Sequence, residues 1–149
     1  MICACTLQAT ATGKQPRLTD DELMTLVQKQ TFRYFWDFAH PESGLARERS
    51  NDRLEIATIG GSGFGVMAII VGVERGFITR EQGAERLLKI VEFLNKADSY
   101  HGIWAHWMDG ATGKTIPFSR KDDGADLVES AFMFEGLLAA HQYFTHDNP

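Results

Sequence analysis

The sequence is poor in cysteine, in positive charge and in long apolar runs, and each shortage excludes a class of protein. Its two cysteines, Cys3 and Cys5, lie too close together to bridge each other comfortably, so neither a disulfide framework nor a spaced metal site is expected. No apolar run approaches the ~20 residues that span a bilayer. Lys and Arg number 15 against 20 Asp and Glu, which argues against nucleic acid as the main partner because phosphate binding needs a basic surface.

The remaining composition is that of one globular domain. The 149 residues are 44% hydrophobic and 23% charged, which is typical of a soluble protein with a single core. Residues 1–18 are expected to be a disordered leader and residues 19–149 the ordered domain. The run from Ile2 to Cys5 also resembles the end of a bacterial lipoprotein signal. This alternative predicts a periplasmic or outer-membrane protein with a lipid anchor at Cys5.

Hydrophobic periodicity predicts four helices. The first begins at Thr19 as N-cap, with Glu22 completing a capping box, and ends at His40-Pro41. The second is apolar on every side, so a strand is its main alternative, but the glycine stop at Gly76 favours a helix. The other expected elements are a polar loop over 42–58, a helix over 79–96, an irregular β-hairpin over 101–119 and a last helix from Asp122 or Asp123 to Phe144.

These helices alternate between amphipathic and apolar, which predicts an all-α fold in two layers. The first and third helices would be outer helices with one wet face, and the second and fourth would be inner helices packed all round. Antiparallel neighbours place the starts of both inner helices at one end, with the long connections 42–62 and 98–121. Function is therefore expected at that end.

Three carboxylates are predicted to project from one face of the last helix. Asp122, Asp126 and Glu129 are spaced i, i+4 and i+7, about 6 Å and then about 4.5 Å apart along the axis. Clustered carboxyl groups can supply the acid and base that hydrolysis of a glycosidic bond requires. Alternatively, acidic residues in a first turn cap amides and stabilise the helix dipole. That alternative does not account for Glu129 inside an apolar helix.

Aromatic residues directly precede this cluster. Trp104, His106 and Trp107 are candidates for stacking on sugar rings and binding their hydroxyl groups, although both tryptophans could instead pack the hairpin onto the helices. Arg49 is a candidate for pairing with the carboxylates and for contacting substrate. No metal ligand set is predicted.

Two further motifs resemble sequences that bind phosphate groups. The stretch from Gly60 to Gly65 matches neither a Walker A loop nor GxGxxG, and it indicates a close backbone approach at the start of a packed helix. The run from Asp122 to Asp126 also fits DDxxD, with which prenyl-diphosphate enzymes bind Mg²⁺. No second aspartate-rich segment accompanies it, and diphosphate binding would need more convergent Lys and Arg.

Five runs of the sequence together carry a family resemblance: Gly60–Gly65, Val73–Phe77, Trp104–Trp107, Asp109–Lys114 and Asp122–Ala131. They resemble the bacterial glucoamylase-like family, which includes the endo-β-1,2-glucanases of glycoside hydrolase family 144. The resemblance covers about residues 20–145. It implies an (α/α)6 toroid with its cleft at the inner-helix starts, and inverting hydrolysis of a glucan by an exported protein without metal or organic cofactor. Asp122, Asp126 and Glu129 align with acidic residues that line the family's cleft.

The chain departs from this family in extent. Two helical hairpins are predicted where the toroid uses six, so the rest of the toroid, with the general acid, is expected beyond Pro149. The isolated chain would then expose the apolar faces of its inner helices, and we expect it to be inactive alone. The expected partners are a glucan and the remaining C-terminal part of the toroid. A non-catalytic helical module that binds saccharide or a partner chain is the alternative.

Overall fold

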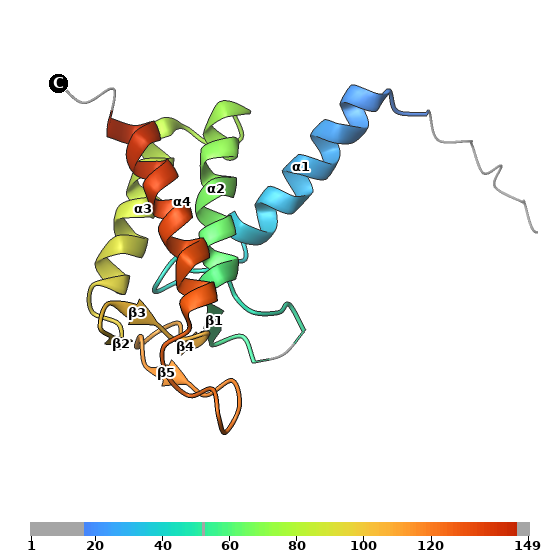
Figure 1. Ribbon diagram of the computed structural model, residues 1–149. Helices are drawn as coiled ribbons and strands as arrows, with labels where there is room; N and C mark the ends of the chain where they lie inside the picture. Colours follow the sequence, from blue (N-terminus) through green and yellow to red (C-terminus); the bar gives the residue numbers. More distant parts are fainter. Residues whose placement is uncertain (1–16, 52, 146–149) are drawn as a thin grey trace, which may run out of the picture.

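The computed structural model describes residues 17–51 and 53–145, which form four helices and five short strands (Figure 1). The predicted leader, including Cys3 and Cys5, lies outside these residues except for its last two positions. Within the described ranges, every helix is too short or too polar to cross a membrane. The elements in chain order are α1 (Asp20–Trp36), β1 (Ile56–Thr58), α2 (Ile59–Glu74), α3 (Arg80–Leu94), β2 (Ser99–Tyr100), β3 (Ile103–Trp104), β4 (Trp107–Asp109), β5 (Thr115–Ile116) and α4 (Leu127–Thr145).

Helices α2 and α4 lie side by side at the centre (Figure 1). Glycine permits their close approach, because a Cβ on Gly63 would lie 2.3 Å from the Phe132 carbonyl oxygen and a Cβ on Gly136 would lie 2.6 Å from that of Gly63. The glycine-rich stretch therefore makes the close backbone approach that the sequence indicates, and the preference for a helix over a strand is confirmed. The core formed around this contact includes Val66, Ile69 and Met133.

Helices α1 and α3 are the two amphipathic helices. The predicted capping box of Thr19 with Glu22 forms, and Thr79 forms a second capping box with Gln82 at the start of α3. Helix α3 lies against α2 and α4. The C-terminal part of α1 packs on α2, with the Phe32 ring against Gly72 and the Phe35 ring against Gly65, whereas its N-terminal part projects away from the other helices (Figure 1). The predicted end of α1 at His40 is wrong: the helix stops at Trp36, because His40 forms a turn in which its N–H donates to the Leu45 carbonyl and its carbonyl accepts from the Gly44 N–H.

Two small sheets lie at the end where α2 and α4 begin (Figure 1). One has the order β1-β4-β5 with antiparallel pairs, and the other is the hairpin β2-β3. The fold is therefore not purely all-α. The single hairpin predicted over 101–119 is two hairpins, and the loop predicted to run to Thr58 ends in a buried strand.

The start of the last helix also differs from the prediction. Helix α4 begins at Leu127, and the run from Asp122 to Asp126 is a loop closed by a turn between Ser119 and Asp122. The starts of α2 and α4 do lie at the same end, beside both long connections, as the layer pattern predicts (Figure 1). The inner helices are not packed all round within the described residues: α2 exposes Phe64, Met67 and Val71, and α4 exposes Leu127, Val128, Phe132, Phe134 and Leu138.

Candidate active site

A histidine lies between two carboxylates at the common starting end of α2 and α4. His106 Nδ1 is 3.3 Å from Asp126 Oδ2, and His106 Nε2 is 3.9 Å from Glu129 Oε1. The three side chains are 18–22% exposed. One face of the imidazole is stacked on Phe118, with ring centroids 4.2 Å apart and planes at 19°. These contacts fix the ring on two edges and one face.

Glu129 also closes the start of α2. Its Oε2 accepts a hydrogen bond of 2.8 Å from the N–H of Gly60. The first turn of α2 has no acidic residue, and its N-cap Thr58 makes no side-chain capping bond, so Glu129 supplies the acceptor that this helix start lacks. A side chain at position 60 would be excluded, because its Cβ would lie 2.4 Å from that oxygen. The carboxylate that seemed unexplained inside an apolar helix therefore has a structural role, and its second oxygen still faces His106.

Asp126 is the N-cap of α4. Its Oδ1 accepts from the N–H groups of Val128 and Glu129 at 2.9 and 3.1 Å, so the cap leaves Oδ2 free to face His106. The Asp126 N–H donates to the Trp104 carbonyl at 2.8 Å. The loop that carries His106 and the helix that carries Glu129 are thereby tied together at Asp126.

Asp122 joins this group from the loop and not from a helix. A carboxylate oxygen of Asp122, an oxygen of Asp126 and a ring nitrogen of His106 lie within 4.8 Å of one another. The prediction that Asp122, Asp126 and Glu129 share one helix face is therefore wrong, but their gathering at one end is correct. Among the described residues, His106, Asp122 and Asp126 are the set whose spacing could hold a metal ion.

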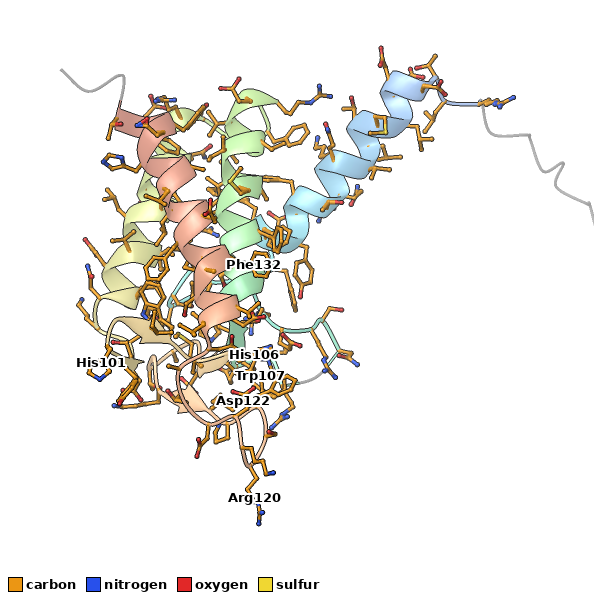
Figure 2. The ribbon with its side chains drawn as sticks, viewed as in Figure 1. His101, His106, Trp107, Arg120, Asp122 and Phe132 are labelled. Carbon is orange, nitrogen blue, oxygen red and sulfur yellow. The ribbon has the colours of Figure 1, made fainter. Side chains whose placement is uncertain are left out.

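The aromatic candidates of the hairpin region separate into different environments. The Trp104 indole N–H donates to the Leu94 carbonyl at 3.4 Å, and its ring packs on Phe134. Trp107 is only 7% exposed. Trp104 therefore packs its strand onto the helices, as the structural alternative predicts. Trp107 instead lies against Phe118, with ring centroids 4.7 Å apart, and the Arg53 guanidinium lies over its ring. His106 is the member of this group that reaches the carboxylates. Figure 2 shows His106, Trp107 and Asp122 beneath the start of α4.

The basic candidates lie away from the cluster. Arg49 is an exposed side chain with its Nε 3.8 Å from Glu48 Oε1, so it pairs with the neighbouring residue and not with Asp122, Asp126 or Glu129. Arg120 points away from the cluster at the tip of its loop (Figure 2).

A cavity of about 370 Å³ opens beside Glu129 and His106. It contains two polar residues that the sequence reasoning missed, Tyr34 and Glu48. Burial and then the nearby Glu48 carboxylate raise the pKa of the Tyr34 phenol, with Arg47 acting in the opposite direction. Tyr34 looked like one more member of the apolar stripe of α1, and Glu48 like one more charge in a polar loop, so no local pattern singled them out. The other lining residues are Phe35, Ala46, Arg47, Thr58, Gly60, Gly61, Phe64 and Phe132.

No family model matches the chain, but individual proteins and solved structures do. Over 132 residues the chain is 54% identical to the exo-β-1,2-glucooligosaccharide sophorohydrolase (non-reducing end) of Parabacteroides distasonis, covering 88% of this chain and 18% of that protein. A glucoamylase-like structure from Bacteroides uniformis is 83% identical, with a TM-score of 0.87, and the match covers 91% of this chain and 33% of that one. The endo-β-1,2-glucanase of Chitinophaga pinensis, solved with sophorotriose and glucose, is 54% identical, with a TM-score of 0.85, covering 89% of this chain and 33% of that one.

The family resemblance is confirmed. The chain spans a third of the length of these two solved relatives and 18% of the Parabacteroides protein. It therefore corresponds to one portion of each glucoamylase-like or β-1,2-glucanase relative. The three relatives are named as a sophorohydrolase, a glucoamylase and an endo-β-1,2-glucanase, and none of these names is that of a prenyl-diphosphate enzyme, which the DDxxD alternative requires. In the structure Asp123 is an exposed loop residue.

Proposed function

We propose that this chain is the N-terminal part of a glycoside hydrolase that acts on β-1,2-glucan. The observation that carries the proposal is 54% identity to two proteins named as hydrolases of β-1,2-linked glucans, over 88% and 89% of the chain. The site supports it, because Asp122, Asp126 and Glu129 gather at one end of the molecule next to a cavity. We propose further that the four helices are two hairpins of an (α/α)6 toroid.

The mechanism that we propose gives different roles to Glu129, in the first turn of α4, and Asp126, the N-cap of that helix. Inverting hydrolysis needs one carboxyl group to protonate the leaving oxygen and another to activate water. Glu129 has Oε2 tied to the Gly60 N–H, so Oε1 is the oxygen that can meet water or sugar in the cavity. Asp126 uses Oδ1 as the cap of α4 and Oδ2 to hold His106, which in turn sets the side on which Glu129 Oε1 lies. The general acid would come from the rest of the toroid.

The proposed partner of this segment is that remaining part of the toroid. Large apolar side chains on α2 and α4, such as Met67 at 42% exposed and Leu138 at 63%, have no cover within the described residues. A groove of about 410 Å³ between α3 and α4 is lined by apolar side chains that include Leu87, Leu137 and Phe144. Both surfaces suit further helices.

The function can be tested in the framework of a close relative. The matching third of the Bacteroides uniformis protein would be replaced by this chain, which is 83% identical to it. We expect the chimera to release reducing sugar from linear β-1,2-glucan, and the isolated chain to release none. The product pattern on long and short glucans would separate endo from exo action.

Two results would contradict the proposal. A folded chimera that binds β-1,2-glucooligosaccharides without cleaving them would instead favour the non-catalytic saccharide-binding module. A folded chimera without binding or turnover would reject both functions. Circular dichroism and a cooperative thermal transition would establish that the chimera is folded.

We propose, separately, that the protein is exported as a lipoprotein with its lipid on Cys5. The Ile2-Cys3-Ala4-Cys5 run supports this, although it lies outside the described residues. Metabolic labelling with palmitate in a bacterial host, compared between the native sequence and Cys5→Ser, tests it. Equal labelling of the two would reject the anchor.

A further inference from the structure

The cavity beside Glu129 has an aromatic wall that the carboxylate cluster does not use. Phe64 lies in the second turn of α2 and Phe132 in the second turn of α4. Their rings are 5.1 Å apart with planes at 36°, and the side chains are 56% and 43% exposed. Both rings line the same cavity as Glu129 and Gly60. Figure 2 shows Phe132 above His106, at the end where the two helices begin.

The backbone fixes where these rings stand. They flank the closest approach of α2 and α4, where Gly63 faces the Phe132 carbonyl. Because a side chain at Gly63 is excluded there, the two rings can meet across the contact without an intervening group. The aromatic wall is therefore set by the same packing that sets Glu129 against Gly60.

Polar groups face this wall from the loop after α1. Glu48 lines the cavity, is 24% exposed and lies 3.8 Å from the Arg49 Nε. The Tyr34 hydroxyl donates to the Arg47 carbonyl at 2.8 Å, which anchors that loop to α1. The cavity thus combines exposed rings with two carboxylates, Glu48 and Glu129.

The combination of exposed aromatic rings and carboxylates indicates what kind of ligand this cavity can bind. An apolar helix packed over Phe64 and Phe132 would take Glu48 and Glu129 Oε1 out of water and offer them no hydrogen-bond donor, which is costly because the basic groups that face them, Arg49 and His106, lie 3.8 and 3.9 Å away. A pyranose presents C–H groups on its faces and hydroxyl groups on its rim, so it can satisfy rings and carboxylates together. The relative from Chitinophaga pinensis was solved with sophorotriose and glucose.

We propose that Phe64, Phe132 and Glu48 form a subsite that binds one glucose unit of a β-1,2-linked glucan beside the unit held at Glu129. The inference rests on the proposed function for its choice of sugar. The rings contact the C–H face of the glucose unit, and the Glu48 carboxylate accepts hydrogen bonds from its hydroxyl groups. None of the three residues takes part in the cleavage itself.

The chimera described above provides the test, with a matched pair of variants on one helix. Phe132→Leu removes a ring from the cavity, whereas Phe134→Leu removes a ring of similar exposure, 40% against 43%, that packs on Trp104 instead. We expect Phe132→Leu to raise KM for sophorotriose or β-1,2-glucan about tenfold with kcat changed less than about twofold. Phe134→Leu should leave KM unchanged. Glu48→Gln, which retains the size of the side chain, should also raise KM.

Direct binding separates this proposal from the proposed function. Calorimetric titration with sophorotriose needs no turnover and should show the same loss of affinity in Phe132→Leu. Cleavage by the chimera with an unchanged KM and affinity in both Phe132→Leu and Glu48→Gln would overturn the subsite and retain the function. Binding that depends on Phe132 without cleavage would retain the subsite and overturn the hydrolase. A fall in thermal stability of Phe132→Leu without any change in affinity would show that the ring is a packing residue and would also overturn the subsite.

Discussion

Two regions of the α2–α4 pair differ: the end where both helices begin, and the flanks, which are the exposed apolar faces farther along the two helices. Backbone amides of the first region have partners, whereas exposed apolar side chains of the second have no cover within the described residues. At the starting end, the amides of Gly60, Val128 and Glu129 are all bonded to carboxylates of the cluster. Along the flanks, Val71 and Leu138 are 40% and 63% exposed. The segment therefore satisfies these helix-start amides within itself, but leaves its apolar surface open. Changes at the starting end should act on activity, and changes on the flanks on association and stability.

The largest effect is expected at the starting end from Asp126→Asn. Asn remains a good N-cap, so α4 should stay folded. The variant loses the charge that faces His106, and we expect activity of the chimera to fall about 100-fold or more. Initial rates of glucan cleavage, with circular dichroism and the melting temperature as controls, measure this. Normal turnover would show that Asp126 is not part of the active site.

The contact between the two helices should be the most sensitive point for stability. Gly63→Ala places a Cβ against the Phe132 backbone, which cannot move without displacing α4. We expect a loss of about 1–3 kcal/mol in the free energy of unfolding. Urea unfolding of the chimera provides the value. Gly124→Ala is the matched control, because a Cβ at Gly124 meets nothing within 4 Å, and equal losses in the two variants would contradict the packing described for Gly63.

A smaller effect is expected on the flank. Leu138→Lys in the isolated chain should reduce self-association, because it places a charge in the exposed apolar surface of α4. The free energy of unfolding should change by no more than about 0.5 kcal/mol. Sedimentation velocity at several concentrations measures association, and Gln142→Lys, at an exposed polar position on the same helix, controls for the one added positive charge. If both variants associate as the native chain does, the exposed apolar surface around Leu138 does not drive self-association.

The smallest effect is a pH dependence near β4. Hydrogen bonds from the Thr112 hydroxyl and amide hold the pKa of Asp109 below its usual range. Because the folded pKa is the lower one, this stabilisation is complete above the ordinary value of 3.8 and is lost as the pH falls through the lowered value. Asp109→Asn should therefore remove part of the acid sensitivity, by less than about 1 kcal/mol since the group is largely solvated.

Urea unfolding of the chimera between pH 2.5 and 6, chosen to bracket the titration of carboxylates, measures this difference. Asp123→Asn, at an exposed loop position three residues before the N-cap of α4, Asp126, is the control. An unchanged pH profile for Asp109→Asn would show that the turn does not favour the charged form.

Local contacts explain what the sequence could predict. Each capping box joins residues three apart, so Thr19 with Glu22 and Thr79 with Gln82 are readable from the chain itself. The glycine-rich start of α2 and its apolar run likewise indicate a packed helix. The alternation of amphipathic and apolar helices predicted the end at which the carboxylates, His106 and the cavity gather, because it depends only on helix order.

The features that the sequence could not predict depend on contacts between residues far apart in the chain. Glu129 bonds Gly60 across 69 positions, so its capping role is invisible in either segment alone. Strand β1 is three residues long and exists through its pairing with β4. Asp122 reaches His106 through a loop whose turn depends on Ser119, and the i, i+4, i+7 spacing therefore suggested a helix face that does not form.

The hydrogen bond from Gly60 to Glu129 makes one backbone amide a reporter of the whole site. Because amide protons exchange with solvent only when their bonds open, the exchange rate at Gly60 measures how often the Glu129 carboxylate leaves its place. Substrate that meets Glu129 Oε1 would slow this exchange without touching Gly60. The exchange rate of the Gly60 amide at the start of α2 thus reports the motion of a side chain on α4.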